Sequence, residues 1–393
     1  MIDARFWRAA FAAGLLVLTA APGPAAAQAG AAQAGAAQAG VAKPDPTPPV
    51  PTFTRSLASF AKSNPAPKCF DRRTEPYTGV SDAHFHPRPF GGQAIEPTTL
   101  FQYFDKAGVR FVTYMGIGQS LDMKSDCTYY LNCPGVKALP SIKNDFVNGQ
   151  EMKVYPHDNV HITLSMTFVD LAHPEGAVET IKLYDREFPG MFAWMGEANV
   201  MKQALLGNGF EPPTFESIDR WAPFMKVLEQ RGIPLTVHAD LGNDAEPTKF
   251  VPLMQHVLKT YPNNKIVWAH MGLSKELTKM NPKLHVAIMR KALDTYPNLM
   301  LDISWDVIYN AYYQYGQDFI DLFNAYPTRI LNGSDFVAAG DKPFEQYWKE
   351  LEITSRVNRR LNDEAFRQIA LGENYFRLLN LDYVAPPVCR AGR

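Results

Sequence analysis

Short apolar runs alternate with longer amphipathic segments from residue 79 to the end of the chain. The runs are rich in Val, Ile, Leu, Met and Phe over several consecutive residues, which is typical of parallel strands that are buried on both faces. The pattern predicts eight strands, at residues 79–86, 109–117, 160–168, 192–200, 234–240, 265–272, 299–305 and 329–336.

Segments with helical periodicity separate the strands, at residues 98–107, 173–188, 215–231, 250–261, 284–296 and 317–326. Eight strands that alternate with helices predict an α/β fold of the (β/α)8 or TIM-barrel type. An open doubly wound sheet is the alternative, but it would carry a Gly-x-Gly-x-x-Gly turn after its first strand. Gly116-Ile117-Gly118 lacks the third glycine, so the barrel is favoured.

Two additions to a simple barrel are expected. Residues 119–158 are too long for a plain connection and form a long insertion after the second strand. Residues 362–380 have the pattern of an extra amphipathic helix at the C-terminal end.

The first residues have the pattern of a secretory signal peptide. Arg5 and Arg8 precede an apolar stretch, and Ala25-Ala26-Ala27 offers a small-residue cleavage site. The apolar stretch at residues 9–21 is too short to cross a bilayer comfortably, although an uncleaved anchor is the alternative. We therefore expect an exported protein, periplasmic or extracellular, with no membrane attachment after cleavage of residues 1–27.

A low-complexity region follows the signal. It repeats Ala-Ala-Gln-Ala-Gly and then becomes rich in proline, a composition that cannot form a core. Residues 28–67 are predicted to be a disordered linker, and residues 68–393 the folded domain.

Export also affects the four cysteines, because disulfides persist in oxidising compartments. Three pairings are possible. The favoured one joins Cys69 to Cys389, across the folded domain, and Cys127 to Cys133, inside the insertion.

The charge is balanced, with 39 basic and 40 acidic side chains. This balance, and the lack of a basic run in the sequence, argue against a nucleic-acid partner.

Candidate metal ligands gather at the ends of the predicted strands. His84 and His86 close the first strand, and residues two apart in a strand point to the same face. Four further side chains lie at the C-terminal ends of other strands: Glu197, His238, His270 and Asp335. Barrel enzymes place their chemistry at this face. A single buried histidine is more often structural, but this convergence favours a metal site.

Asp82 and Asp302 lie near the ends of the first and seventh strands. We interpret them as residues that orient the metal ligands. Ordinary polar residues at a strand end are the alternative.

The residues that carry these patterns resemble the amidohydrolase superfamily, specifically its amidohydrolase-2 group of metal-dependent hydrolases and decarboxylases. The likeness rests on Asp-x-His-x-His at 82–86, His238, His270, Gly-Ser-Asp at 333–335 and the closing Gly-Glu-Asn-Tyr-Phe-Arg-Leu at 372–378. It covers essentially the whole folded region.

The resemblance implies a ligand set for one divalent metal ion, usually zinc: His84, His86, His238 and Asp335. It implies that His270 contacts the substrate or transfers a proton. In two-metal relatives a carboxylate at the position of Glu197 bridges the ions, and His238 and His270 hold the second one. In one-metal relatives this glutamate orients a ligand or binds substrate. We favour one metal.

Three imidazoles and a carboxylate leave an open position at the metal. Asp335 can accept a proton from water and pass it on, and His270 can bind a developing oxyanion. The predicted function is therefore hydrolysis of an ester, lactone or amide of a small molecule. A metal-dependent decarboxylase of an aromatic or unsaturated carboxylic acid is the alternative, and a non-catalytic exported metal-binding protein is a third. The expected partner is a small-molecule substrate, and a homodimer stays open.

Overall fold

The computed structural model describes residues 53, 55–65, 68–75, 79–121, 125–305 and 307–389. All of them belong to a compact unit that begins at Thr47. The predicted signal peptide and most of the predicted linker lie outside the described residues.

The strands form one parallel sheet, with the order β10-β9-β8-β7-β6-β5-β2-β1-β11. Their bounds are β1 (Ser81–His86), β2 (Phe111–Met115), β5 (His161–Met166), β6 (Phe192–Met201), β7 (Leu235–Ala239), β8 (Ile266–Trp268), β9 (Leu299–Asp302), β10 (Ile330–Leu331) and β11 (Phe336–Val337). Their side chains are almost all buried, as expected for parallel strands covered on both faces.

The two strands at the ends of this order, β10 and β11, belong to one chain segment, and the sheet therefore closes into a barrel. β10 pairs with β9, and β11, which is separated from β10 by four residues, pairs with β1. Between these pairs, the Ala83 amide donates to the Asn332 carbonyl at 2.9 Å. β10 and β11 are thus two halves of an eighth strand, and the predicted (β/α)8 barrel is confirmed.

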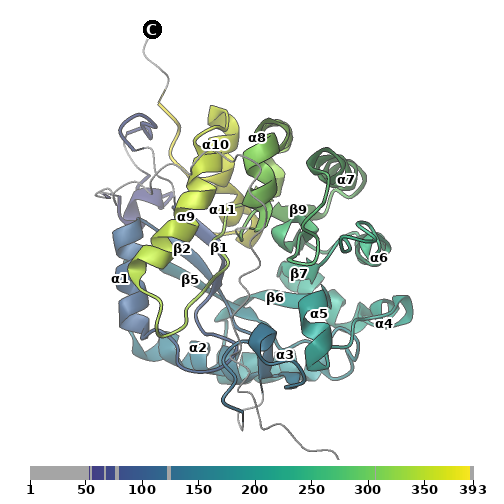
Figure 1. Ribbon diagram of the computed structural model, residues 1–393. Helices are drawn as coiled ribbons and strands as arrows, with labels where there is room; N and C mark the ends of the chain where they lie inside the picture. Colours follow the sequence, from purple (N-terminus) through teal and green to yellow (C-terminus); the bar gives the residue numbers. More distant parts are fainter. Residues whose placement is uncertain are drawn as a thin grey trace, which may run out of the picture. The chain divides into compact units, whose positions relative to one another are not determined.

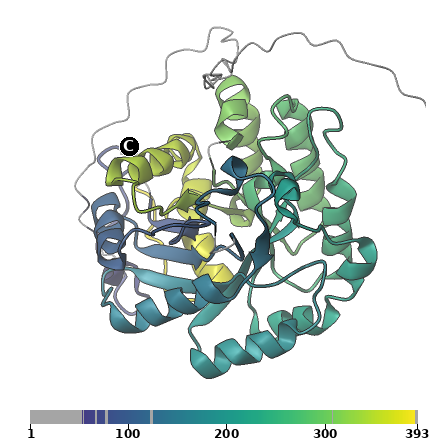
Figure 2. The same cartoon turned by 60° about the horizontal axis from the view of Figure 1, so that its bottom comes forward.

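Helices lie outside the strands, as Figures 1 and 2 show. Their bounds are α1 (Pro97–Ala107), α2 (Lys143–Val154), α3 (Ala177–Glu187), α4 (Phe215–Asp219), α5 (Ala222–Arg231), α6 (Val251–Thr260), α7 (Pro282–Thr295), α8 (Val307–Ala325), α9 (Phe344–Asn358), α10 (Asp363–Ile369) and α11 (Glu373–Leu379). α9 was not predicted, although Phe344, Tyr347, Trp348 and Leu351 form its buried face at helical spacing.

Two predicted helices are divided in the structure. The C-terminal helix predicted for 362–380 breaks into α10 and α11 at Gly372, whose φ of 87° is left-handed. The helix predicted for 215–231 breaks into α4 and α5, where Pro223 lacks the amide hydrogen that would continue it.

The insertion after β2 is a packed structure. It contains β3 (Gln119–Leu121) and β4 (Ala138–Pro140), which pair antiparallel, and the 3-10 helix η2 (Tyr130–Asn132). Leu121, Tyr130 and Ala138 form a small core with Leu205 of the 3-10 helix η3 (Gln203–Asn208). A Cys127–Cys133 disulfide closes the loop before β4.

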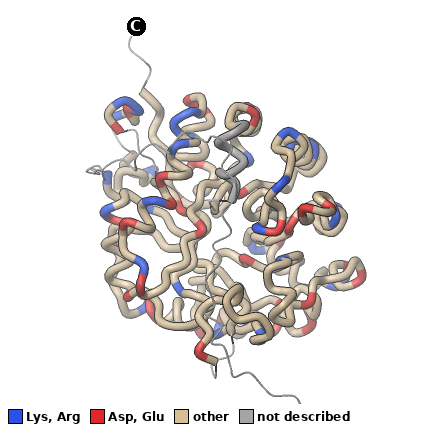
Figure 3. The backbone as a smooth tube through the Cα atoms, in the orientation of Figure 1, with Lys and Arg blue, Asp and Glu red and all other residues tan. Residues whose placement is uncertain are grey.

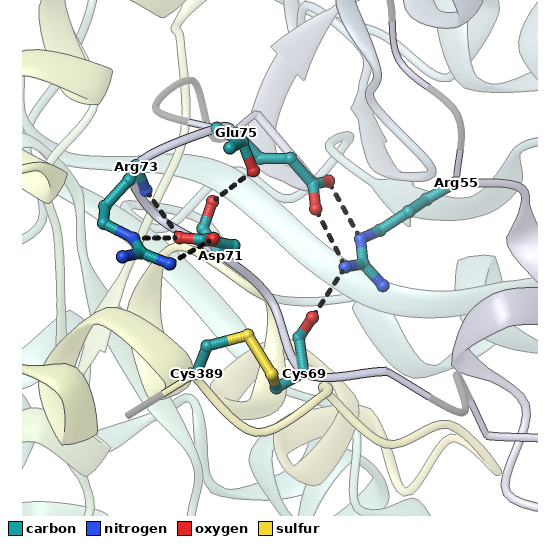
Figure 4. Close-up of a disulfide and its surroundings, with 7 residues drawn as sticks. Arg55, Cys69, Asp71, Arg73, Glu75 and Cys389 are labelled. Atoms are coloured by element: carbon teal, nitrogen blue, oxygen red, sulfur yellow. Dashed lines mark hydrogen bonds and ion pairs between the residues drawn. A yellow bond between two sulfur atoms is a disulfide. The ribbon is translucent and has the colours of Figure 1, made fainter. Parts of the chain in front are cut away.

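A second disulfide joins Cys69 to Cys389 across a sequence separation of 320, so the cysteines pair as favoured above. Figure 4 shows Arg55 beside it, donating to the Cys69 carbonyl at 3.3 Å and to both carboxylate oxygens of Glu75.

The folded part of the chain begins before residue 68. Residues 55–65, which the composition assigned to the linker, contain the 3-10 helix η1 (Leu57–Phe60). The Phe60 side chain is buried in the main core and meets the rings of Phe111 and Phe376. The Val384 amide also donates to the Phe60 carbonyl at 2.8 Å, so this short segment is part of the folded domain, which composition alone does not show.

Acidic and basic residues are interspersed over the outer helices, as Figure 3 shows. Within the described part of the chain, no helix combines the length and apolar character needed to cross a membrane.

Candidate metal centre

The four histidines and two carboxylates predicted as candidate ligands meet at the C-terminal ends of the strands. His84 and His86 come from β1, Glu197 from β6 and His238 from β7. His270 lies in η4 (Ala269–Gly272), a 3-10 turn directly after β8, and Asp335 lies between β10 and β11. The histidines are buried, whereas the Asp335 side chain is 14% exposed.

Three of these residues form the tightest group. The Nε2 atoms of His84 and His86 are 3.2 Å apart. Asp335 Oδ1 lies 3.0 Å from His86 Nε2 and 3.4 Å from His84 Nε2. Ligand atoms around a tetrahedral zinc ion, with bonds of about 2.0–2.1 Å, are about 3.3 Å apart. The spacing of this trio therefore fits a divalent metal ion such as zinc.

Each histidine of the trio uses its outer nitrogen for a hydrogen bond. His84 Nδ1 lies 2.6 Å from Asp302 Oδ2, and His86 Nδ1 lies 3.0 Å from the Met115 carbonyl. When Nδ1–H donates outward, the Nε2 lone pair points inward, toward Asp335. Ligating histidines in metalloproteins are oriented in the same way.

His270 is held by the same network. Its Nδ1 lies 3.0 Å from Ser304 Oγ, and that hydroxyl donates to Asp302 Oδ2 at 2.8 Å. Asp302 thus connects the outer nitrogens of His84 and His270, and its role in orienting the ligands stays a prediction. His270 Nε2 faces inward, 3.8 Å from Asp335 Oδ2.

His238 directs its Nδ1, and not its Nε2, toward another candidate ligand, Glu197. Its Nε2 lies 2.9 Å from Asp240 Oδ1, and its Nδ1 is hydrogen-bonded to Glu197. His238, Glu197 and His270 form a second group of ligand-type atoms that lie within 4.8 Å of one another. The prediction that His238 completes the set of His84, His86 and Asp335 stays a prediction.

Glu197 faces both groups. Its Oε2 lies 3.7 Å from His86 Nε2 and 3.9 Å from His84 Nε2, and its Oε1 lies 3.8 Å from His270 Nε2. The ammonium of Lys202, which directly follows β6, lies 3.2 Å and 3.3 Å from the two oxygens. Burial by itself would raise the pKa of Glu197, but Lys202 and His238 hold that pKa well below its usual range.

Neighbouring charges also shift the pKa values of His84 and Asp335. Burial by itself lowers the pKa of His84, but the carboxylates of Asp302, Asp335 and Glu197 outweigh it and raise that pKa to about 9. For Asp335, burial acts to raise the pKa, and His270 and His84 lower it more strongly. Glu197 and Asp335 are therefore ionised, and a divalent ion bound between their carboxylates would stabilise these buried charges.

Asp82 supports the loop that carries Asp335. It accepts hydrogen bonds from the Ser334 amide at 2.9 Å, the Ser334 hydroxyl at 2.6 Å and the Tyr347 hydroxyl at 3.1 Å. Burial raises the pKa of Asp82 to about 6 in spite of these donors. Gly333 is required in this loop, because a Cβ there would lie 2.9 Å from the Cβ of His84.

A cavity of about 850 Å³ opens over the centre, a size suited to a small-molecule ligand. Its floor includes His86, His238, His270, Lys202 and Asp335. Aromatic side chains contribute to its walls: Phe90, Tyr129, Tyr130 and Trp305. The two tyrosines come from the disulfide-closed loop of the insertion.

Residues 164–381, more than half of the chain, match a family model described as amidohydrolase. The chain belongs to this amidohydrolase family. Glu197, His238, His270 and Asp335 lie within the matched residues, and β1 with its two histidines precedes them. No curated protein matches the amidohydrolase chain.

Solved structures resemble the chain at low identity. A dihydroorotase from Campylobacter jejuni is 14% identical, with 78% of this chain and 84% of that chain covered and a TM-score of 0.47. An amidohydrolase from Burkholderia multivorans with bound zinc is 13% identical, with 78% and 99% covered and a TM-score of 0.48. A D-hydantoinase is 11% identical, with 79% and 74% covered and a TM-score of 0.49.

Three residues of this amidohydrolase centre were not found from the sequence: Lys202, Asp240 and Ser304. Each directly follows a strand or lies within two residues of its end. The sequence offered only that position as a signal, and barrel ends carry many polar residues without a role in chemistry.

Proposed function

We propose that this amidohydrolase is a hydrolase of an ester, lactone or amide of a small molecule and uses one divalent ion, zinc. The observation that carries the proposal is the spacing of 3.0–3.4 Å among His84 Nε2, His86 Nε2 and Asp335 Oδ1 at the floor of a cavity. When bound there, the ion would supply Lewis acidity that polarises a carbonyl group and lowers the pKa of water.

Asp335 is placed to handle a proton. Its Oδ1 belongs to the trio, and its Oδ2 faces His270 Nε2 at 3.8 Å. It is also the most exposed of the six candidate ligands and lines the cavity. A water molecule that attacks a substrate here can give its proton to Asp335, and the leaving group can take it afterwards.

His270 is the second proton-handling group. Because Nδ1 is held by Ser304, Nε2 points to the cavity floor. From Nε2, a protonated His270 would donate a hydrogen bond to a developing oxyanion on the substrate.

Export remains part of the proposal. The signal pattern of residues 1–27 suggests it, and two disulfides with no free cysteine among the described residues are consistent with an oxidising compartment. The proposed partner is a small-molecule substrate, and a homodimer can be tested by sedimentation.

The test is a substrate screen with the zinc-loaded protein. Esters, lactones and cyclic and linear amides are assayed for acid release, and aromatic and unsaturated carboxylic acids are assayed for CO2 release. Hydrolysis that disappears on chelation and returns with zinc supports the proposal. Release of CO2 without hydrolysis would instead establish the decarboxylase, and a protein that binds no divalent ion would refute both.

A further inference from the structure

Lys202 is a buried cation inside a cluster of metal-ligand side chains. Its side chain is 11% exposed and lines the cavity together with His238 and His270. A lysine is almost never buried without a carboxylate partner, and here the partner is Glu197.

The position of the ammonium decides what Glu197 can do. Nζ is almost equally distant from the two carboxylate oxygens, at 3.2 Å and 3.3 Å. It therefore lies in front of the carboxylate, on the side where the lone pairs of both oxygens are available. A carboxylate that bridges two ions offers one lone pair of each oxygen on that same side.

A second ion would have to bind between Glu197, His238 and His270. In this group, Glu197 Oε1 is hydrogen-bonded to His238 Nδ1 and lies 3.8 Å from His270 Nε2. Because the ammonium contacts the same carboxylate, an ion held there would lie within a few ångströms of a like charge. Like charges at this range in a buried site repel strongly, and displacing Lys202 would leave its charge unpaired.

We propose that Lys202 takes the place of a second metal ion and makes this a one-metal centre. The ammonium supplies the positive charge that Glu197 needs and blocks its use as a bridge. Lys202 is thus a positioning residue, which keeps Glu197 directed at His238. The inference rests on the proposed function in one respect, the binding of the first ion by His84, His86 and Asp335.

The experiment counts metal ions in the full chain. Wild type, Lys202→Met, Lys202→Arg and Lys275→Met are saturated with zinc, desalted and analysed by mass spectrometry for zinc per chain. Lys275 is a matched control, since it also lines the cavity but its ammonium lies over the ring of Trp305. The expected counts are one for wild type, K202R and K275M, and two for K202M. The double variant K202M with Glu197→Gln is expected to return to one, because the second ion then lacks its carboxylate.

A count of two in wild type, or of one in folded K202M, would overturn the role of Lys202. Electron paramagnetic resonance of the wild type loaded with manganese tests the one-metal centre even if the variants do not fold. A spectrum of isolated ions is expected, and the spectrum of a coupled pair would contradict the proposal. Wild type that holds one zinc and hydrolyses nothing would refute the proposed function and leave the role of Lys202 intact. Wild type that takes up no zinc would refute both.

Discussion

At the scale of single residues, the centre is defined by which nitrogen of each imidazole is held. Asp302, the Met115 carbonyl, Ser304 and Asp240 each fix the outer nitrogen of one histidine. An imidazole fixed in this way loses little freedom when it binds an ion. Neighbouring carboxylates raise the pKa of His84 and of His238, so protons and metal compete for these imidazoles.

This competition predicts the pH dependence of zinc affinity. The pKa of His84 is raised to about 9 in the metal-free protein, so below that pH zinc has to displace a proton. The dissociation constant is expected to fall about tenfold per pH unit as the pH rises from 6, and to level off near pH 9. Isothermal titration calorimetry between pH 6 and 9, with correction for buffer protonation, measures it. An affinity that does not change with pH would contradict the assignment of His84 as a ligand.

Asp302→Asn tests the group that holds His84. Without this carboxylate, the pKa of His84 falls, and the affinity should level off at a lower pH. The plateau affinity should be weaker by about 10–100-fold, as is usual when the partner of a ligating histidine is removed. Asp145→Asn is the control, because Asp145 is equally buried but accepts from Thr167 and Tyr184. Equal effects of the two substitutions would show that only stability had changed.

Asp335→Asn separates the chemistry from the fold. Asp335 has a left-handed φ of 59°, and asparagine is one of the few residues that tolerate this conformation. The variant should therefore fold, while loss of the proton-accepting carboxylate should lower turnover by about 10²–10⁴-fold. Circular dichroism checks the fold, and initial rates on the best substrate of the screen check the loss. Turnover close to wild type would remove Asp335 from the mechanism.

At the scale of elements, the strands were predictable and several of the contacts between them were not. Runs such as Ile266–Trp268 are buried on both faces, so their apolar character is continuous and easily recognised. His84, His238 and His270 stood out because each ends such a run. Lys202 did not stand out, because it follows the strand that carries Glu197 and its role depends on the ammonium reaching back to that carboxylate five residues earlier. The pattern along one strand does not contain that distance.

The turn that carries His270 depends on a neighbouring helix. His270 and Met271 in η4 have left-handed φ values of 54° and 51°. His285 of α7 is fully buried, and its Nε2 donates to the Met271 carbonyl at 2.8 Å. Burial lowers the pKa of His285 to about 4, so the residue is neutral in the folded protein and keeps the turn in place.

This contact predicts how stability depends on pH. The unfolded chain protonates His285 near pH 6.5 and the folded chain only near pH 4, so stability from this group is complete above pH 6.5 and is lost as the pH falls. The loss approaches about 3 kcal/mol. His285→Gln keeps a donor for the Met271 carbonyl and does not titrate. Urea unfolding at pH 5 and pH 8 should therefore show a smaller pH effect in the variant. An unchanged pH effect would mean that other groups cause it.

At the scale of the whole molecule, the barrel is closed in two ways. The segment that carries Asp335 closes the sheet between β10 and β11, so the last candidate ligand is placed only when the barrel is complete. The disulfide between Cys69 and Cys389 then joins the segment before β1 to the segment after α11. Folding and assembly of the centre are therefore the same event, since no part of the barrel contains the whole trio.

The two disulfides should differ in their effect on stability because they close loops of very different length. In the chain-entropy model, a cross-link across 320 residues restricts the unfolded chain by about 6 kcal/mol, and one across 6 residues by about 2 kcal/mol. The pair Cys69→Ser and Cys389→Ser should thus lower the free energy of unfolding by about 4 kcal/mol more than the pair Cys127→Ser and Cys133→Ser. Urea unfolding of the metal-free variants at one pH measures both. The reverse order would show that the Cys127–Cys133 loop, which holds Tyr129 and Tyr130 over the cavity, contributes native contacts that outweigh chain entropy.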